Sequence, residues 1–125
     1  MPGPTVAPDR LEEPVAFTSV LAQATVADLA PAEAWYSALF DRSPDGRPMD
    51  GLIEWHLGDH FGVQVWADPA RCGRSTIVLS TDDLDAVSMR LNDAGIEHDG
   101  PQQATSTRVL QLGDPDGNRV VLTGA

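Results

Sequence analysis

The stretch that decides the fold runs from residue 108 to residue 123 and reads RVLQLGDPDGNRVVLT. Two runs rich in β-branched and aliphatic residues, 108–112 and 119–123, flank Asp-Pro-Asp-Gly-Asn at 114–118. A cluster of these residue types is typical of a tight turn, because each supplies a backbone conformation or a local hydrogen bond that turns need. The stretch therefore predicts an antiparallel β-hairpin.

Parts of this stretch, and of the segments before it, recur in the chain at a constant offset of 55 in the numbering. The matches are Asp28-Leu29 with Asp83-Leu84, Leu57-Gly58-Asp59 with Leu112-Gly113-Asp114, and Gly62 with Gly117. Each pair occupies the same place in the pattern of apolar runs, so the offset predicts two copies of one structural unit. A chain of 125 residues is long enough for one domain and too short for two independent cores.

Alternation and helical periodicity predict the elements of the first copy. Residues 15–26 have the β-branched, alternating character of a strand. Asp28 is placed to cap a helix whose apolar residues, at 32, 35, 36, 39 and 40, share one face. A loop is expected at 43–50, and a hairpin of two strands at 52–57 and 62–66.

The second copy repeats this order. A strand is expected at 75–80, and an amphipathic helix from Leu84 that ends at Gly95. A short extended piece at 96–98 precedes the hairpin of 108–123. With the repeat applied to both copies, we expect each to have the order β-α-β-β-β, with the first module at about 15–67 and the second at about 75–124. Residues 1–14 hold four of the ten prolines and predict a flexible arm before a single domain at 15–125.

Charge and composition exclude several classes of protein. The eight basic residues are all arginine, and with nineteen acidic residues they give a net charge of −11. An acidic domain repels phosphate backbones, so we expect no nucleic-acid partner. No apolar run approaches the ~20 residues that cross a bilayer, so we expect no membrane span. One cysteine and the absence of a signal-like leader predict a cytoplasmic protein.

Several segments together resemble the vicinal oxygen chelate superfamily, the group of glyoxalase I, bleomycin resistance protein and extradiol dioxygenase. The segments are Val26–Leu29 leading into Ala34–Tyr36, Thr81–Leu84, Leu91–Ile96 and Gly113–Leu122. The Asp-Pro-Asp-Gly-Asn turn followed by a strand is the most specific of them. The resemblance implies an α+β fold of two βαβββ modules with curled mixed sheets around a central cavity. It also implies a homodimer.

Metal-dependent members of that superfamily place ligands on the first and last strand of each module. Carried over onto this chain, those positions are Leu21, Gln64, Thr76 and Val121. Leucine and valine offer no lone pair, and a hydroxyl and an amide are weak neutral ligands, so this set predicts no metal and no other cofactor.

Strand alternation predicts which side chains line the cavity. The lining consists of amides, hydroxyls, aliphatic groups and one indole, and its proposed ligand contacts are Leu21, Gln23, Gln64, Trp66, Thr76, Gln111 and Val121. Strand 52–57 is left open, because a slip of one residue exchanges its two faces. One face offers Glu54 and His56, a candidate acid–base pair. The other offers Trp55, a second aromatic platform for a ligand.

Three hypotheses about function follow. The first is a metal-free protein that binds a small organic ligand, cationic or aromatic, since indole faces and negative potential both favour cations. The second is a lyase, isomerase or dioxygenase that uses Glu54 and His56 or a non-standard metal site. The third is a dimeric interaction or regulatory module without a ligand.

Overall fold

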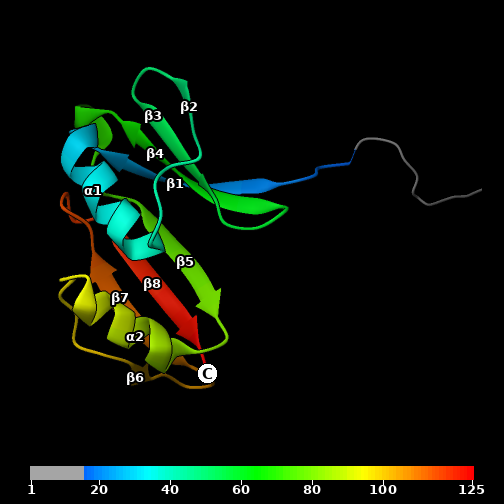
Figure 1. Ribbon diagram of the computed structural model, residues 1–125, viewed down its shortest axis with the longest axis vertical. Helices are drawn as coiled ribbons and strands as arrows, with labels where there is room; N and C mark the ends of the chain where they lie inside the picture. Colours follow the sequence, from blue (N-terminus) through cyan, green and yellow to red (C-terminus); the bar gives the residue numbers. More distant parts are fainter. Residues whose placement is uncertain (1–15) are drawn as a thin grey trace, which may run out of the picture.

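The structure, a computed structural model, describes residues 16–125, so the predicted arm at 1–14 lies outside the described residues (Figure 1). In chain order the elements are β1 (Val20–Val26), α1 (Leu29–Phe40), β2 (Gly46–Met49), β3 (Leu52–His56), β4 (Phe61–Ala67), the 3-10 turn η1 (Pro69–Arg71), β5 (Thr76–Thr81), α2 (Leu84–Asp93), β6 (Gln102–Gln103), β7 (Arg108–Gly113) and β8 (Arg119–Gly124). No helix in the described part of the chain is long and apolar enough to span a membrane.

The strands form two sheets of four, and each sheet belongs to one module. The first has the order β1-β4-β3-β2 and the second the order β5-β8-β7-β6. In both, the first strand of the module pairs in parallel with the last, and the remaining pairs are antiparallel. The predicted α+β fold of two βαβββ modules is confirmed, but the two mixed sheets remain open and do not close into a barrel.

Helix α1 covers one face of the first sheet. It begins where the Asp28 side chain accepts the backbone N–H of Ala30, and it ends at Asp41, whose φ of 56° lies in the left-handed region. Tyr36 and Leu39 are buried against the sheet. On the sheet side, β3 and β4 bury alternate residues, as a half-covered strand does. The contact therefore uses one helix stripe and one sheet face, as predicted.

Helix α2 covers the second sheet in the same way. The Asp83 side chain caps its first turn by accepting from Ala86, and Gly95, with a φ of 79°, follows its end. Leu84 and Leu91, on the inner side of α2, are fully buried. The predicted glycine stop is confirmed, because a left-handed residue just past a helix costs least when it is glycine.

The two modules meet at the DPDGN turn of residues 114–118. Asn118 is fully buried: its Oδ1 accepts the backbone N–H of Ser75, and its Nδ2 donates to Thr25 O and to Asp114 Oδ2, each at 2.8 Å. The Tyr36 hydroxyl, from the first module, donates to the same Asp114 oxygen at 2.8 Å. The turn therefore closes a hairpin and also fastens the second module to the first.

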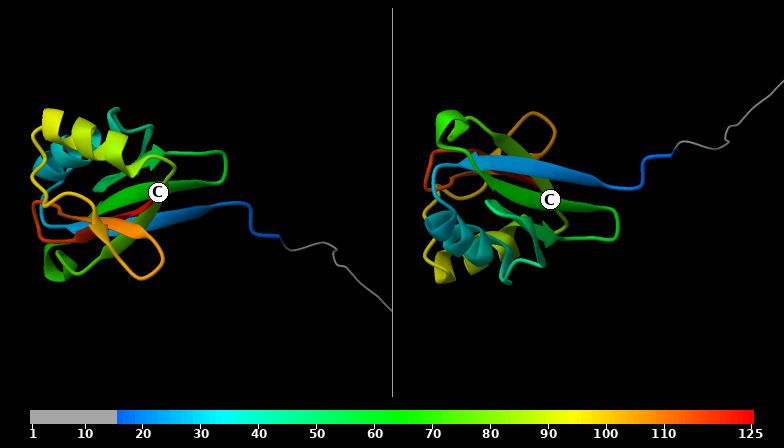
Figure 2. Two further views of the ribbon diagram at one scale, coloured as in Figure 1. Left: turned by 90° about the horizontal axis from the view of Figure 1, so that it is seen from below. Right: turned by 90° about the horizontal axis from the view of Figure 1, so that it is seen from above.

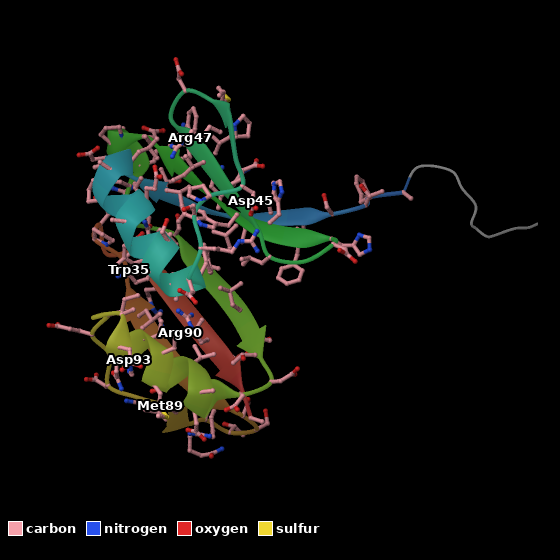
Figure 3. The ribbon with its side chains drawn as sticks, in the orientation of Figure 1. Trp35, Asp45, Arg47, Met89, Arg90 and Asp93 are labelled. Atoms are coloured by element: carbon pink, nitrogen blue, oxygen red, sulfur yellow. The ribbon has the colours of Figure 1, made fainter. Side chains whose placement is uncertain are left out.

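A second link joins the helices. Arg90 of α2 reaches the C-terminal end of α1, where its guanidinium donates to the carbonyl oxygens of Ala38 and Leu39 (Figure 3). These carbonyls have no partner within the helix, and the negative end of the helix dipole favours a cation there. Arg90 thus stabilises α1 and holds the two modules together.

Three expectations about the elements are wrong. The segment 43–50 contains edge strand β2 rather than only a loop, and no strand forms at 96–98, whereas β6 lies at Gln102–Gln103. The segment 43–50 has no apolar alternation, because an edge strand with little buried area does not need it. Residues 16–19 of the predicted first strand lie outside β1.

The repeat offset is 55 for the first strands and the helices but 57 for the hairpins. Leu21 pairs with Gly62, and its counterpart in the second module, Thr76, pairs with Arg119. Thr76 and Arg119 are two residues farther apart in the sequence than Leu21 and Gly62. The second module thus has two more residues between its helix and its hairpin. Gly62 corresponds to Arg119, so the match of Gly62 with Gly117 reflects similar turn composition and not equivalent positions.

Candidate functional site on the open sheet faces

Each sheet has one face covered by its helix and one open face, and the sequence-predicted site residues fall mainly on the open faces. On the first sheet, Gln23, Gln64 and Glu54 lie side by side in register across β1, β4 and β3. His56 lies two residues further along β3, on the same side as Glu54. The structure therefore selects one of the two alternatives for strand 52–57: Glu54 and His56 face the open side.

These four side chains form a continuous hydrogen-bonded row. The Gln23 amide donates to Gln64 Oε1, and Gln64 Nε2 donates to Glu54 Oε2 at 3.1 Å. His56 Nε2 lies 3.1 Å from Glu54 Oε1. Both carboxylate oxygens of Glu54 are thus engaged, and its side chain is 14% exposed, whereas that of His56 is 56% exposed. The row presents an oriented carboxylate and an accessible imidazole to whatever lies on this face.

Asp45 fixes the end of this row. Its Oδ2 accepts the backbone N–H of His56 at 2.7 Å, and its Oδ1 accepts from Arg42 at 2.6 Å. The hydrogen bond from His56, followed by that from Arg42, lowers the pKa of Asp45 below its ordinary value. Asp45 stands beside the strands of the first sheet (Figure 3). It was not a candidate in the sequence, because its segment was expected to be a loop.

Trp55 does not belong to the open face, which corrects the expectation that it contacts a ligand. The side chain is fully buried, its Nε1 donates to Arg42 O, and its ring lies 5.5 Å from Phe40 and 6.0 Å from Tyr36. Trp66, in register with Thr25 and Leu52, is the half-buried indole on the open side. One aromatic platform is present there instead of two.

Strand β1 and the β3–β4 turn project beyond the helices (Figure 2). A hollow lies at this end of the row. Its volume is about 200 Å³, and its lining includes Leu21, His56 and Phe61. Gly62 lies in register between Leu21 and His56. A Cβ at Gly62 would stand 2.3 Å from Trp55 O and 2.9 Å from Leu21 Cδ2, so only glycine lets these strands approach as they do.

The open face of the second sheet has a different chemistry. Val78, Val121 and Gln111 lie in register across β5, β8 and β7, and the neighbouring row contains Thr76 and Arg119. Val78 is 61% exposed. This face has an aliphatic row of Val78 and Val121, with the hydroxyl groups of Thr76, Ser80 and Thr123 and the amide of Gln111 around it.

Arg119 is a residue that the sequence analysis missed. It lies two residues before Val121 on the same strand, so the period-two rule that placed Val121 on this face places Arg119 there as well. Its Nη2 donates to Gln111 Oε1 at 2.7 Å. The signal is present in the sequence, but the sequence-based lining follows the last strand forward from Val121 and does not extend the alternation back to Arg119.

The four positions implied for metal ligands do not fit a catalytic divalent metal. Leu21 and Val121 have no donor atom, and Gln64 already uses its amide group in the row with Gln23 and Glu54. Among residues 16–125 no three His, Cys, Asp or Glu side chains come together as a ligand group. Protein sites for such metals use at least three strong ligands, and this set supplies none of them.

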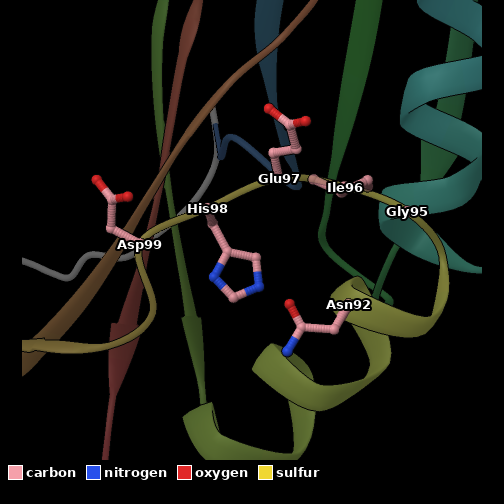
Figure 4. A pocket seen from close by; sticks show the side chains of 6 residues that line it. All are labelled: Asn92, Gly95, Ile96, Glu97, His98 and Asp99. Carbon is pink, nitrogen blue, oxygen red and sulfur yellow. The ribbon is translucent and has the colours of Figure 1, made fainter.

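Another hollow lies between α2 and the segment that follows it (Figure 4). Asn92 and His98 point toward each other across it, and Glu97 and Asp99 lie on its rim. His98 Nδ1 accepts the backbone N–H of Gly100 at 2.9 Å, whereas Nε2 is buried and lacks a partner among the described residues. Because Nε2 is enclosed, it is not accessible to a ligand in the hollow.

Comparison with known proteins agrees with this architecture. The family model of the Glyoxalase/Bleomycin resistance protein/Dioxygenase superfamily matches residues 22–122. No curated protein sequence matches the chain. A glyoxalase / bleomycin resistance protein from Catenulispora acidiphila DSM 44928 is 26% identical, with a TM-score of 0.79 over 86% of this chain and 97% of that chain.

Two further solved structures share the fold at lower identity. TnmS3, an antibiotic binding protein from Streptomyces sp. CB03234, is 23% identical, with a TM-score of 0.72 over 90% of this chain and 98% of that chain. A bleomycin-binding protein complexed with bleomycin is 20% identical, with a TM-score of 0.73 over 86% of this chain and 98% of that chain. With the family model matching most of its length, this chain belongs to the glyoxalase/bleomycin resistance/dioxygenase superfamily.

Proposed function

We propose that this protein binds a small organic ligand, cationic or aromatic, without a metal ion. The observation that carries the proposal is the row of Gln23, Gln64, Glu54 and His56 on an open sheet face, with Trp66 beside it. A few oriented polar groups on an otherwise apolar surface are typical of ligand sites. An anionic carboxylate and an indole both attract a cationic aromatic group. Solved structures with the same fold include proteins named for binding antibiotics.

The site is completed, in this proposal, by a second copy of the chain. Each module leaves its open face uncovered: Leu21 and Val78 on these faces are 37% and 61% exposed, and Phe61 beside the hollow is 49% exposed. Large exposed apolar side chains are typical of surfaces that another protein copy or a ligand covers. A homodimer would cover them and enclose the ligand between faces. Sedimentation at micromolar concentration should give twice the 13.3 kDa of one chain, and a monomer at all concentrations would contradict the dimer.

Thermal unfolding with a panel of cationic aromatic compounds tests the ligand class. A compound at 100 times its Kd should stabilise the fold by about 2.7 kcal/mol. Glu54→Gln should weaken binding about tenfold, because it removes one charge at the row. Asp93→Asn, at the end of α2, is the matched control with the same change of charge and should bind as the wild type does (Figure 3). A panel without any shift would count against this ligand class.

A second candidate function is enzymatic, because Glu54 and His56 lie 3.1 Å apart. A carboxylate that orients an imidazole is the arrangement of a general base, and it suits removal of a proton from carbon next to a carbonyl group. Solvent deuterium incorporation into a panel of small carbonyl compounds would detect this step. Activity that survives in both Glu54→Gln and His56→Ala would exclude the pair as its source.

We also propose a cytoplasmic location. The chain contains one cysteine, Cys72, and an unpaired thiol suits a reducing compartment. Fractionation of cells that express the chain with its natural N-terminus tests this, and recovery from the periplasm or the medium would contradict it.

A further inference from the structure

Arg119 differs from most arginines in the described part of the chain by the partner of its guanidinium. Four others lie within ion-pair distance of carboxylates: Arg42 with Asp45, Arg47 with Glu33, Arg71 with Asp68 and Arg108 with Asp85. Arg90 donates to two helix carbonyls, and Arg74 is exposed in the loop before β5. Arg119 donates to the neutral oxygen of Gln111, and within residues 16–125 no carboxylate lies within ion-pair distance of it. On the open sheet faces, its positive charge is therefore not neutralised by the described chain.

The surroundings of Arg119 leave room for a ligand beside the guanidinium. Across the sheet its neighbours in register are Thr76 on β5 and Gly113 on β7. A Cβ at Gly113 would have nothing within 4 Å, so the space on that side is open. Thr76 is exposed and offers a hydroxyl on the other side. A planar fork with several free N–H donors therefore lies on an accessible surface, which is the geometry that binds carboxylate, sulfonate or phosphate groups.

The next row supplies an apolar surface beside that charge. Val78 and Val121 lie in register, two residues along their strands from Thr76 and Arg119 and on the same face. Val78 is 61% exposed, so a large part of its side chain remains to be covered. The hydrogen bond from Arg119 to Gln111, which belongs to the same row as Val121, holds the guanidinium over the edge of this apolar area.

We propose that the open face of the second sheet is a subsite for an organic anion, in which Arg119 pairs with the acidic group and Val78 and Val121 contact the apolar body. The first sheet presents the Glu54 carboxylate, so the two faces have opposite charge preferences. This inference extends the proposed function from one ligand group to two. The complete ligand is then amphoteric, with a cationic and an anionic group on one molecule. The subsite itself is defined by the second sheet alone.

Two dyes with the same hydrocarbon frame test the subsite. One is 1-anilinonaphthalene-8-sulfonate, and the other is N-phenyl-1-naphthylamine, which lacks the sulfonate. In 0.15 M salt, Arg119→Gln should weaken the sulfonate dye about tenfold, about 1.4 kcal/mol, and change the uncharged dye less than twofold. Val78→Thr, which keeps the side-chain shape, should weaken both dyes because it makes the apolar area polar. Fluorescence titration measures the affinity of each dye for the wild type and for each variant.

Arg71→Gln is the matched control, since Arg71 is 83% exposed on η1 and its loss changes the net charge by the same amount. It should leave both dyes within twofold of the wild type. Equal weakening by Arg71→Gln and Arg119→Gln would overturn the proposal, because the effect would then come from overall charge. Equal weakening of both dyes by Arg119→Gln, or no binding of the sulfonate dye to the wild type, would overturn it too.

Sedimentation of Arg119→Gln at the assay concentration separates the ligand from a second copy as the occupant of this face. Unchanged assembly with lost dye selectivity is the expected result. If the variant alters assembly and keeps the selectivity, Arg119 serves contact between copies, and the subsite is wrong. Binding of the cationic panel through Glu54 is measured on different residues, so either proposal can fail while the other stands.

Discussion

The Tyr36 hydroxyl should make the protein lose stability above pH 10 in a way that one substitution removes. Tyr36 is fully buried, and its hydroxyl donates to Asp114 Oδ2 at 2.8 Å. Burial first, and the Asp114 carboxylate second, raise the pKa of Tyr36 far above its ordinary value near 10. The folded protein therefore keeps the proton, whereas the unfolded chain releases it from about pH 10 upward.

The sign and size of this change in the free energy of unfolding follow from proton linkage. Above pH 10 the folded state binds one more proton than the unfolded state, so stability falls by about 1.36 kcal/mol per pH unit. Between pH 9 and pH 11.5 this amounts to about 2 kcal/mol. The chain has no lysine and Tyr36 is its one tyrosine, so no other side-chain type present has an ordinary pKa near 10. The alkaline limb thus reports Tyr36 alone.

Tyr36→Phe isolates this effect. At pH 9 the variant should be about 1.5 kcal/mol less stable, since it loses one hydrogen bond to a charged group while Asp114 keeps its bonds from Asn118 and from the backbone of Asp116. At pH 11.5 the two proteins should be about equally stable, because only the wild type has lost the linkage contribution. Urea unfolding at both pH values measures the two differences.

Absorbance at 295 nm provides the direct check. Phenolate should appear in the wild type only together with loss of the far-ultraviolet circular dichroism of the folded state. Phenolate forming near pH 10 in a protein that is still folded would refute the reasoning, and so would an equal alkaline loss of stability in the wild type and in Tyr36→Phe.

Three further substitutions test the way the modules are built. Asn118→Ala removes three buried hydrogen bonds at the module junction and should cost about 3 kcal/mol in urea unfolding, and a loss below about 1 kcal/mol would show that the junction is not stabilising. Gly62→Ala places a methyl 2.3 Å from Trp55 O and should lower stability by about 2 kcal/mol or more, whereas Gly113→Ala, which meets open space, is its control. Arg90→Met keeps the apolar stem but uncaps α1, so amide exchange in the last turn of α1 should speed up while that of β8 does not, and unchanged exchange would contradict the capping role.

Most of the fold could be predicted from the sequence because its strands have one covered face. Apolar residues at alternate positions, such as Val63 and Val65, must face the helix, and this fixes the direction of Gln64 between them. The same reasoning, applied to Ile53 and Trp55, would have placed Glu54 on the open side. The sequence analysis leaves this strand undecided because the length of the hairpin turn sets its register, and a slip of one residue would exchange its two faces.

Strand β2 and the change in repeat offset could not be predicted, because no pattern of residue types indicates them. Strand β2 has an exposed or half-exposed residue at every position, and what fixes it is the Asp45 N–H donating to Glu54 O and Arg47 pairing with Glu33. The two extra residues before the second hairpin alter no motif, so the repeat offset looked uniform along the chain. Tertiary contacts decide such features, and local sequence carries little of that information.

The ligand is harder to predict than the fold for a physical reason. Gln23, Glu54, Gln64 and Arg119 all project from the faces that no helix covers, so replacing them changes the buried core very little. Surface changes of this kind cost about 0.5 kcal/mol or less, whereas changes on the covered faces cost several. The residues of the covered faces are therefore constrained by packing, and their pattern predicts the fold. The open faces are free to vary in charge and hydrogen bonding, and their chemistry has to be determined for each chain by binding experiments on the named residues.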